Sequence, residues 1–129
     1  MEAVVAQVGS VMVPHPYTIG GDQPISVAAE RMRAHGIRHL PVLAGGRLVG
    51  LISDRDVRLV ESVADAERVR VEDAMSPEPY CARPETSLRE VVARMHEHKL
   101  GSVLITDEHD RLLGIFTSTD ALRLLVERL

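Results

Sequence analysis

The chain has 129 residues, of which 45% are apolar and 26% are charged, and its formal net charge is −4. This balance is typical of a globular protein and excludes a disordered or collagen-like chain. Aromatic residues make up only 2% of the sequence. Because nucleic-acid binding depends on positive charge and base stacking, we expect no nucleic-acid partner.

The cysteine content and the apolar segments of the sequence indicate the cellular compartment of the protein. Cys81 is the single cysteine, so an intramolecular disulfide is excluded and a reducing environment is indicated. The first nine residues carry no secretion signal, and no apolar run approaches the ~20 residues of a membrane span. We therefore expect a cytoplasmic protein that does not insert into membranes.

The second half of the chain repeats the first. Eight residues recur 63 positions later and, after one inserted residue, four more recur 64 positions later. These twelve are Val8, Met12, Pro14, Pro16, Tyr17, Arg31, Met32, His35, Arg47, Leu48, Gly50 and Asp56. We therefore divide the chain into repeat 1 at residues 8–61, a linker at 62–70 and repeat 2 at 71–127, which together form one globular module.

Each repeat has the predicted order short strand, helix, strand, strand, helix. In repeat 1, apolar residues at helical spacing run from Ile25 to Met32, and Gly36 offers a left-handed C-terminal cap. A hairpin follows, with strands over 38–43 and 48–52 joined by Gly45-Gly46. The linker is polar but contains Val69, so we expect it to be partly ordered.

Repeat 2 gives the same pattern. Leu88, Val91, Val92 and Met95 mark one face of a helix, with Thr86 or Ser87 as its N-cap. Strands over 102–106 and 112–116 follow, joined by a turn at 108–110. Lys99 stands where repeat 1 has Gly36, which predicts left-handed strain or a different cap.

The fold class is therefore α+β, built from two βαββα repeats. A single repeat of about 60 residues would have a marginal core. We expect the two sheets to pack face to face around a pseudo-twofold axis, which would create two equivalent clefts between the repeats.

The most informative segment joins the second hairpin strand to the following helix. Gly50-Leu-Ile-Ser53-Asp-Arg-Asp56 recurs as Gly114-Ile-Phe-Thr117-Ser-Thr-Asp120. A hydroxyl residue followed three positions later by an acid is a common helix cap. The same geometry suits a nucleotide, because a helix N-terminus attracts phosphate and a carboxylate can accept ribose hydroxyls.

These features resemble a tandem pair of CBS domains, or Bateman module. The resemblance rests on the doubled unit, the Arg38-His39-Leu-Pro41-Val42 strand, the two junctions and Met-x-Pro at the head of each copy. It spans about Val8 to Leu125 and leaves no room for an attached catalytic domain. It implies a regulatory module without a required cofactor that binds AMP, ADP, ATP, NAD or S-adenosylmethionine as a regulatory ligand. It further implies a homodimer that modulates an unknown protein partner.

The resemblance also implies two ligand sites, each shared by both repeats. The first comprises Thr18, Ile19, Ser53 and Asp56, with Gly101 and Ser102 from repeat 2. The second comprises Cys81, Ala82, Thr117 and Asp120, with Arg38 and His39 from repeat 1. In both, the Asp would hold the ribose and the hydroxyl would contact phosphate. The permanent charge of Arg38 predicts a phosphorylated nucleotide in the site of Asp120.

The same sequence features allow other interpretations. A dimeric protein–protein interaction scaffold with vestigial, unoccupied clefts would need the two junctions only as helix caps. No Ser-His-Asp arrangement is visible, so we expect no catalytic residue and no enzyme. His96 and His98 are two positions apart on a helix and cannot chelate one ion, so we expect no metal site. A redox role for Cys81 is less favoured than a small apolar pocket residue.

Overall fold

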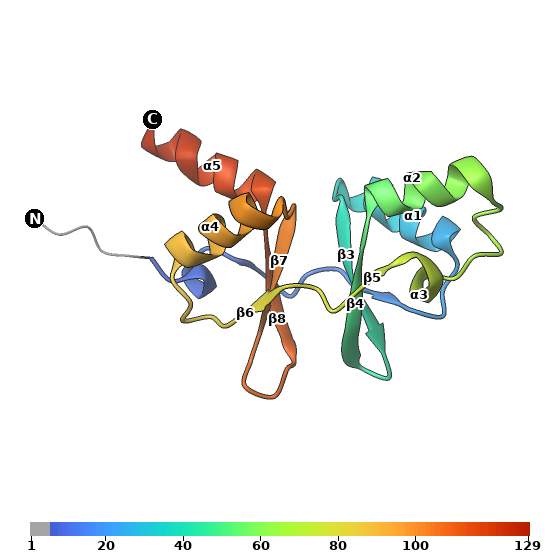
Figure 1. Cartoon of the computed structure of the whole chain (residues 1–129), viewed down its shortest axis with the longest axis horizontal. Coiled ribbons are helices and arrows are strands. Elements are labelled where there is room, and N and C mark those ends of the chain that lie inside the picture. Colours follow the sequence, from blue (N-terminus) through green and yellow to red (C-terminus); the bar gives the residue numbers. More distant parts are fainter. Residues whose placement is uncertain (1–5) are drawn as a thin grey trace, which may run out of the picture. The chain divides into compact units, whose positions relative to one another are not determined.

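A computed structural model describes residues 6–129 and divides them into two compact units. The first unit comprises Tyr17–Pro79, and the second comprises the residues up to Pro16 together with Tyr80–Leu129. Part of the segment used to exclude a secretion signal, residues 1–5, lies outside the described residues. The mixture of sheets and helices confirms the α+β class (Figure 1).

The first unit contains the helix and hairpin predicted for repeat 1. Its elements are β2 (Ile19–Gly20), α1 (Ile25–His35), β3 (His39–Ala44), β4 (Arg47–Ser53), α2 (Asp54–Val63), α3 (Val71–Ala74) and β5 (Ser76–Pro77). The strands form one sheet in the order β2-β3-β4-β5. Within it, β2 is parallel to β3 and the other pairs are antiparallel.

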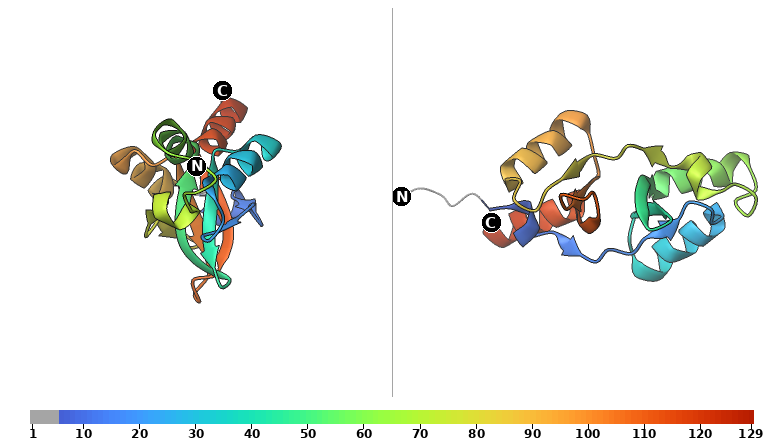
Figure 2. Two further views of the ribbon diagram at one scale, coloured as in Figure 1. Left: turned by 90° about the vertical axis from the view of Figure 1, so that its right-hand side faces the viewer. Right: turned by 90° about the horizontal axis from the view of Figure 1, so that it is seen from below.

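The second unit follows the same plan. Its elements are the 3-10 helix η1 (Val8–Ser10), β1 (Val13–Pro14), β6 (Cys81–Ala82), α4 (Leu88–His98), β7 (Ser102–Thr106), β8 (Leu112–Thr117) and α5 (Ser118–Arg128). Its sheet has the order β1-β8-β7-β6. In Figure 1 and in the left view of Figure 2 the tip of the β7–β8 hairpin points away from the helices of its unit.

The head of each sequence repeat pairs with the unit formed mainly by the other repeat. β1 lies in repeat 1 but pairs with β8, and β5 lies in repeat 2 but pairs with β4. Gly50 permits the second of these contacts, because a Cβ there would meet the carbonyl oxygen of Ser76 at 2.8 Å. Gly114 likewise permits the pairing of β1 with β8, because a Cβ there would meet the carbonyl oxygen of Val13, also at 2.8 Å. Each sheet therefore has one more strand than the three per repeat that the sequence predicts.

Each unit has its own hydrophobic core on the helix-covered face of its sheet. In the first unit α1, α2, β3 and β4 contribute buried residues, among them Ile25, Leu40 and Ile52. In the second unit the core gathers around Phe116, which is fully buried. Burial of these aliphatic side chains is the main stabilising contribution to each unit.

Local predictions about caps and turns are confirmed. Gly36 ends α1 with φ 62°, and Gly45 and Gly46 form the β3–β4 turn with φ 58° and 78°. Ser87, rather than Thr86, caps α4 through its side chain. Lys99 ends α4 in the left-handed conformation with φ 54°, which is the strained alternative that the sequence predicts.

The linker segment is ordered against α1. The backbone N–H of Ile25 donates to the carbonyl of Val69 over 2.9 Å, and that of Ser26 donates to Ala66 over 3.0 Å. These bonds satisfy N–H groups at the start of α1, which has no side-chain cap.

Candidate functional site

The first strand–helix junction lies between β4 and α2. Ser53 is the N-cap of α2, and its Oγ accepts a hydrogen bond from the backbone N–H of Asp56 over 3.1 Å. In return, Oδ2 of Asp56 accepts from the N–H and the hydroxyl of Ser53, both over 2.9 Å. This reciprocal capping box fixes the carboxylate beside the N-terminus of the helix.

The second junction, between β8 and α5, has the same geometry. Oδ2 of Asp120 accepts from the N–H of Thr117 over 2.8 Å and from its hydroxyl over 3.0 Å. Asp120 is 6% exposed, and its Oδ1 lies 3.5 Å from Nη1 of Arg123. No such ion pair to Asp56 is found within residues 6–129. Arg123 is not among the residues predicted from the sequence, although opposite charges three positions apart on a helix predict such a pair.

The start of the neighbouring strand lies beside each junction. His39 pairs with Ser53 in the β3–β4 ladder, and Ser102 pairs with Thr117 in the β7–β8 ladder. The backbone also joins strand and helix, since the N–H of Asp54 donates to the carbonyl of Arg38 over 2.8 Å. Each unit therefore holds a strand start and a helix N-terminus together as one polar site.

The two strand starts differ in charge. Burial lowers the pKa of His39, and Arg38 adds to this, while the carboxylates of Asp54 and Asp56 oppose it. His39 is therefore mainly neutral at pH 7, and Arg38 supplies the permanent positive charge. At the matching place in the second unit, Ser102 is 5% exposed, and its hydroxyl has no hydrogen-bond partner among the described residues.

The residues before the first helix of each unit lie in short strands. The side chains of Ile19 and Ala82 are buried within their hydrophobic cores. The carbonyl of Thr18 accepts from Nη1 of Arg31 over 2.8 Å. Burial raises the pKa of the Cys81 thiol, Asp110 raises it further and Arg83 opposes them. A thiol that stays protonated at neutral pH is a weak nucleophile.

The structure places the predicted site residues of each repeat's own junction within one unit. Thr18, Ile19, Ser53 and Asp56 lie in the first unit, with Arg38 and His39; Cys81, Ala82, Thr117 and Asp120 lie in the second, with Gly101 and Ser102. The assignment of Arg38 and His39 to the site of Asp120, and of Gly101 and Ser102 to that of Asp56, joins residues of different units and stays a prediction.

Residues 6–129 contain neither a metal-binding cluster nor a helix that could span a membrane. No three His, Cys, Asp or Glu side chains in this part of the chain are grouped to hold a metal ion. Within the same residues, every helix is too short or too polar to cross a bilayer.

The family follows from the doubled fold and its junctions. The model of the CBS domain matches residues 8–62 and 71–127. The chain therefore belongs to the CBS domain family, and it carries two copies of the domain.

Similar proteins include enzymes much longer than this chain. The inosine-5'-monophosphate dehydrogenase of Korarchaeum cryptofilum (strain OPF8) is 29% identical over 120 residues, which cover 93% of this chain and 24% of that protein. The L-aspartate semialdehyde sulfurtransferase of Methanocaldococcus jannaschii is 27% identical over 125 residues, or 96% of this chain and 24% of that protein. The chain thus spans about a quarter of the length of these curated relatives, whose activities are those of the whole proteins.

Solved structures of similar size share the fold. The CBS domain pair of protein MJ0100, in complex with 5'-methylthioadenosine and S-adenosyl-L-methionine, has a TM-score of 0.90 and 25% identity, covering 98% of this chain and 100% of that one. An uncharacterized conserved protein from Pyrococcus horikoshii has a TM-score of 0.87 and 25% identity, covering 99% and 98%. The βαββα arrangement of both units is therefore that of a CBS domain pair.

Proposed function

We propose that this chain is a regulatory module that binds an adenosine-containing nucleotide in clefts between its two repeats and thereby modulates a protein partner. The observation that carries the proposal is the doubled junction, in which a hydroxyl residue and Asp56 or Asp120 are fixed at a helix N-terminus. Membership of the CBS domain family and the adenosyl ligands of the MJ0100 pair support it. Regulation would further require that the ligand bind two states of the module unequally.

The side-chain chemistry of the junction residues suits them to different parts of a nucleotide. Asp56 and Asp120 would accept the ribose hydroxyls, since each carboxylate has more acceptor capacity than the cap uses. Ser53 and Thr117, with the N–H groups of the helix start, would contact phosphate. The first site would be completed by Thr18, Ile19, Gly101 and Ser102, and the second by Cys81, Ala82, Arg38 and His39.

The residues at the start of β3 and of β7 would determine whether each site prefers a ligand with or without phosphate. Arg38 can make charge-assisted hydrogen bonds, so the site of Asp120 would favour AMP, ADP, ATP or NAD. Gly101 and Ser102 offer only neutral groups, so the site of Asp56 would tolerate an adenosyl compound without phosphate. No catalytic group is needed, and the nucleotide would act as a regulatory ligand rather than a cofactor.

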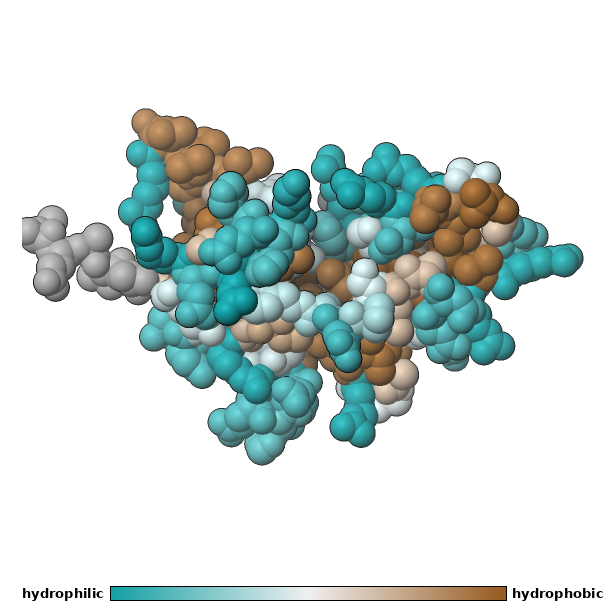
Figure 3. Space-filling view, in the orientation of Figure 1, coloured by the Kyte–Doolittle hydropathy of each residue, from teal (hydrophilic) through white to brown (hydrophobic). Residues whose placement is uncertain are grey.

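The proposal includes a homodimer in the cytoplasm. α5 exposes an apolar stripe in which Leu122 is 61% and Val126 is 70% exposed, and Figure 3 shows apolar surface gathered over this helix. Exposed stripes of this kind mark association surfaces. The lone Cys81 fits a reducing compartment.

Calorimetric titration with AMP, ADP, ATP, NAD and S-adenosylmethionine tests the proposal. We expect at least one of them to bind the wild type, and binding to weaken in Asp56→Ala or Asp120→Ala. Asp73→Ala is the matched control, because Asp73 is an exposed acid of α3 outside either junction. Absence of binding by ligand-free protein to all five compounds would overturn the proposal.

The alternative is a dimeric interaction scaffold whose junctions only cap helices. It is favoured by the contacts of Asp120, which already engages Thr117 and Arg123. In this case Asp120→Ala would lower the free energy of unfolding by about 1 kcal/mol, as expected for a cap. Partner binding would be retained, and no nucleotide would bind.

A further inference from the structure

The first unit has a groove between α1 and α2 that is lined by charged side chains. Five of them line it: Arg33, Arg38, Asp54, Arg58 and Glu61. Arg58 and Asp54 form an ion pair over 3.2 Å. A surface that covers this groove must offer polar partners, because a charge taken out of water without a partner costs much free energy.

The matching face of the second unit is mainly apolar. The repeat offsets of 63 and 64 positions place other residues where the first unit has its five charged side chains. They are His96, Gly101, Ser118, Leu122 and Leu125. Leu122 and Leu125 of α5 are 61% and 54% exposed, and Val92 of α4 is 39% exposed. Lys99, at the end of α4, takes the place of Gly36 and is exposed. The same place in the fold is therefore charged in one unit and apolar in the other.

The exposed apolar residues of α5 form a stripe along one face of the helix, over which Figure 3 shows apolar surface. This α5 stripe comprises Leu122, Leu125, Val126 and Leu129. The core of the second unit instead uses Ala121 and Leu124 of the same helix. The spacing of the stripe reads the same in both directions. An antiparallel second copy of α5 would therefore set Leu125 against Val126 and Leu122 against Leu129.

The charges of α5 favour a second copy as the partner of this stripe. The helix carries two acids, Asp120 and Glu127, and two arginines, Arg123 and Arg128. It therefore has no net side-chain charge that would repel a second copy. Helices that bind anionic membranes are instead rich in basic residues on their polar face.

We propose that the α5 stripe packs against the α5 stripe of a second copy, so that the homodimer forms through its two second units. The inference rests on the homodimer of the proposed function and names the surface that forms it. The contact is isologous, since the same residues meet from both copies. In a head-to-tail dimer the stripe would enter the α1–α2 groove of the other copy and would remove water from its arginines and carboxylates.

Sedimentation equilibrium of the full chain tests the surface. Leu125→Glu installs the residue that the first unit has at this position, Glu61, and an isologous contact would bring two such carboxylates together. We expect a dimeric wild type and a dissociation constant at least about 30-fold higher in Leu125→Glu, as for the loss of a central interface residue. Leu59→Glu is the matched control, because Leu59 is a 64% exposed leucine of α2 outside the groove. It should leave the dissociation constant unchanged.

Disulfide cross-linking tests the arrangement without adding a charge. Cys81→Ser removes the single native cysteine, and Leu125→Cys is added to that variant. Because Leu125 lies near the middle of the stripe, we expect mild oxidation to link two copies through this position. A head-to-tail dimer predicts no such link. It predicts instead a link when the Leu125→Cys protein is mixed with a Glu61→Cys protein of the same background.

The outcomes separate this inference from the proposed function. A dimer that persists unchanged in Leu125→Glu overturns the inference and leaves the homodimer standing. A cross-link formed only with Glu61→Cys also overturns it, because the contact would then be head to tail. A monomeric wild type overturns both the α5 contact and the homodimer, whereas nucleotide binding by that monomer would leave the ligand sites of the proposed function standing.

Discussion

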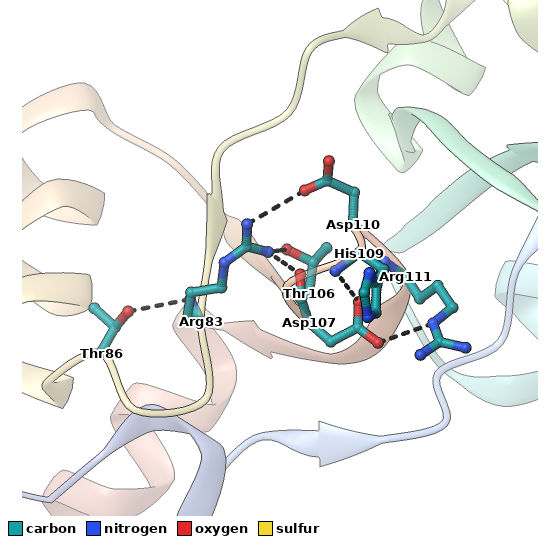
Figure 4. Close-up of polar contacts among 7 residues, drawn as sticks. All are labelled: Arg83, Thr86, Thr106, Asp107, His109, Asp110 and Arg111. Carbon is teal, nitrogen blue, oxygen red and sulfur yellow. Dashed lines mark hydrogen bonds and ion pairs between the residues drawn. The ribbon is translucent and has the colours of Figure 1, made fainter.

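Arg83 donates a hydrogen bond from Nη1 to Oγ1 of Thr106 over 2.8 Å, and Thr106 is only 3% exposed (Figure 4). The same guanidinium bonds the carbonyl oxygen of Asp107 and lies 3.4 Å from Oδ1 of Asp110. Arg83 thus holds the β7–β8 turn to the segment that precedes α4. Repeat 1 has Gly20 at the matching position, so this contact belongs to repeat 2.

Arg83→Ala should lower the free energy of unfolding by about 1–3 kcal/mol, because the buried hydroxyl of Thr106 loses its donor. Urea unfolding of the full chain measures the change. The double variant Arg83→Ala/Thr106→Val should recover much of it, since the hydroxyl that Arg83 leaves unpaired is then removed as well. Arg111→Ala is the control: Arg111 pairs with Asp107 on the surface over 2.9 Å, and such pairs contribute about 0–1 kcal/mol. Failure of the double variant to recover stability would contradict this account.

Gly50→Ala should destabilise the first unit by about 1–3 kcal/mol, because the added methyl would meet the carbonyl oxygen of Ser76 at 2.8 Å. Backbone cannot yield as a side chain can, so β5 would have to move. Gly20→Ala is a matched control, since the one close contact of its Cβ would be with Oδ1 of the flexible Asp22 side chain at 2.8 Å. Thermal unfolding of both variants decides the question. Equal losses in the two would show that β5 does not depend on Gly50.

Local features of the fold could be predicted because their causes lie three or four residues apart. The helix face from Ile25 to Met32 and the contact of Ser53 with Asp56 follow from helical spacing alone. The pairing of β1 with β8 could not be predicted in this way. Its two residues pair with a strand about 100 positions away, Val13 with Ile115, and no local pattern records such a partner.

The candidate site was predictable to the same extent. The two capping boxes could be derived from the sequence, and the pairing of His39 with Ser53 follows from the register of a hairpin. The buried hydroxyl of Ser102, which has no hydrogen-bond partner within residues 6–129, could not be foreseen, because burial at this place depends on packing rather than on neighbours in sequence.

Lys99→Gly should raise the free energy of unfolding by up to about 1 kcal/mol. Lys99 ends α4 with φ 54°, a conformation that glycine adopts without the steric cost that a side chain incurs. Gly36→Ala makes the opposite change at the matching position of α1, where φ is 62°, and should cost a similar amount. Chemical denaturation measures both. Destabilisation by Lys99→Gly would mean that the lysine side chain contributes more than the strain removes.

The stability of the chain should fall as the pH is lowered below about 6.5, because burial depresses the pKa of His39 from its usual value of 6.5. Above that pH His39 is neutral in both the folded and the unfolded chain, so its titration does not change the free energy of unfolding. Below it the unfolded chain binds a proton first, so protons favour unfolding until the pH also falls below the folded-state pKa. Urea unfolding at about pH 7.5 and about pH 5.5 should show this loss in the wild type. His39→Gln should reduce it, and His109→Gln, at an exposed position of the β7–β8 turn, should not. A loss of the same size in His39→Gln would assign the pH dependence to other groups.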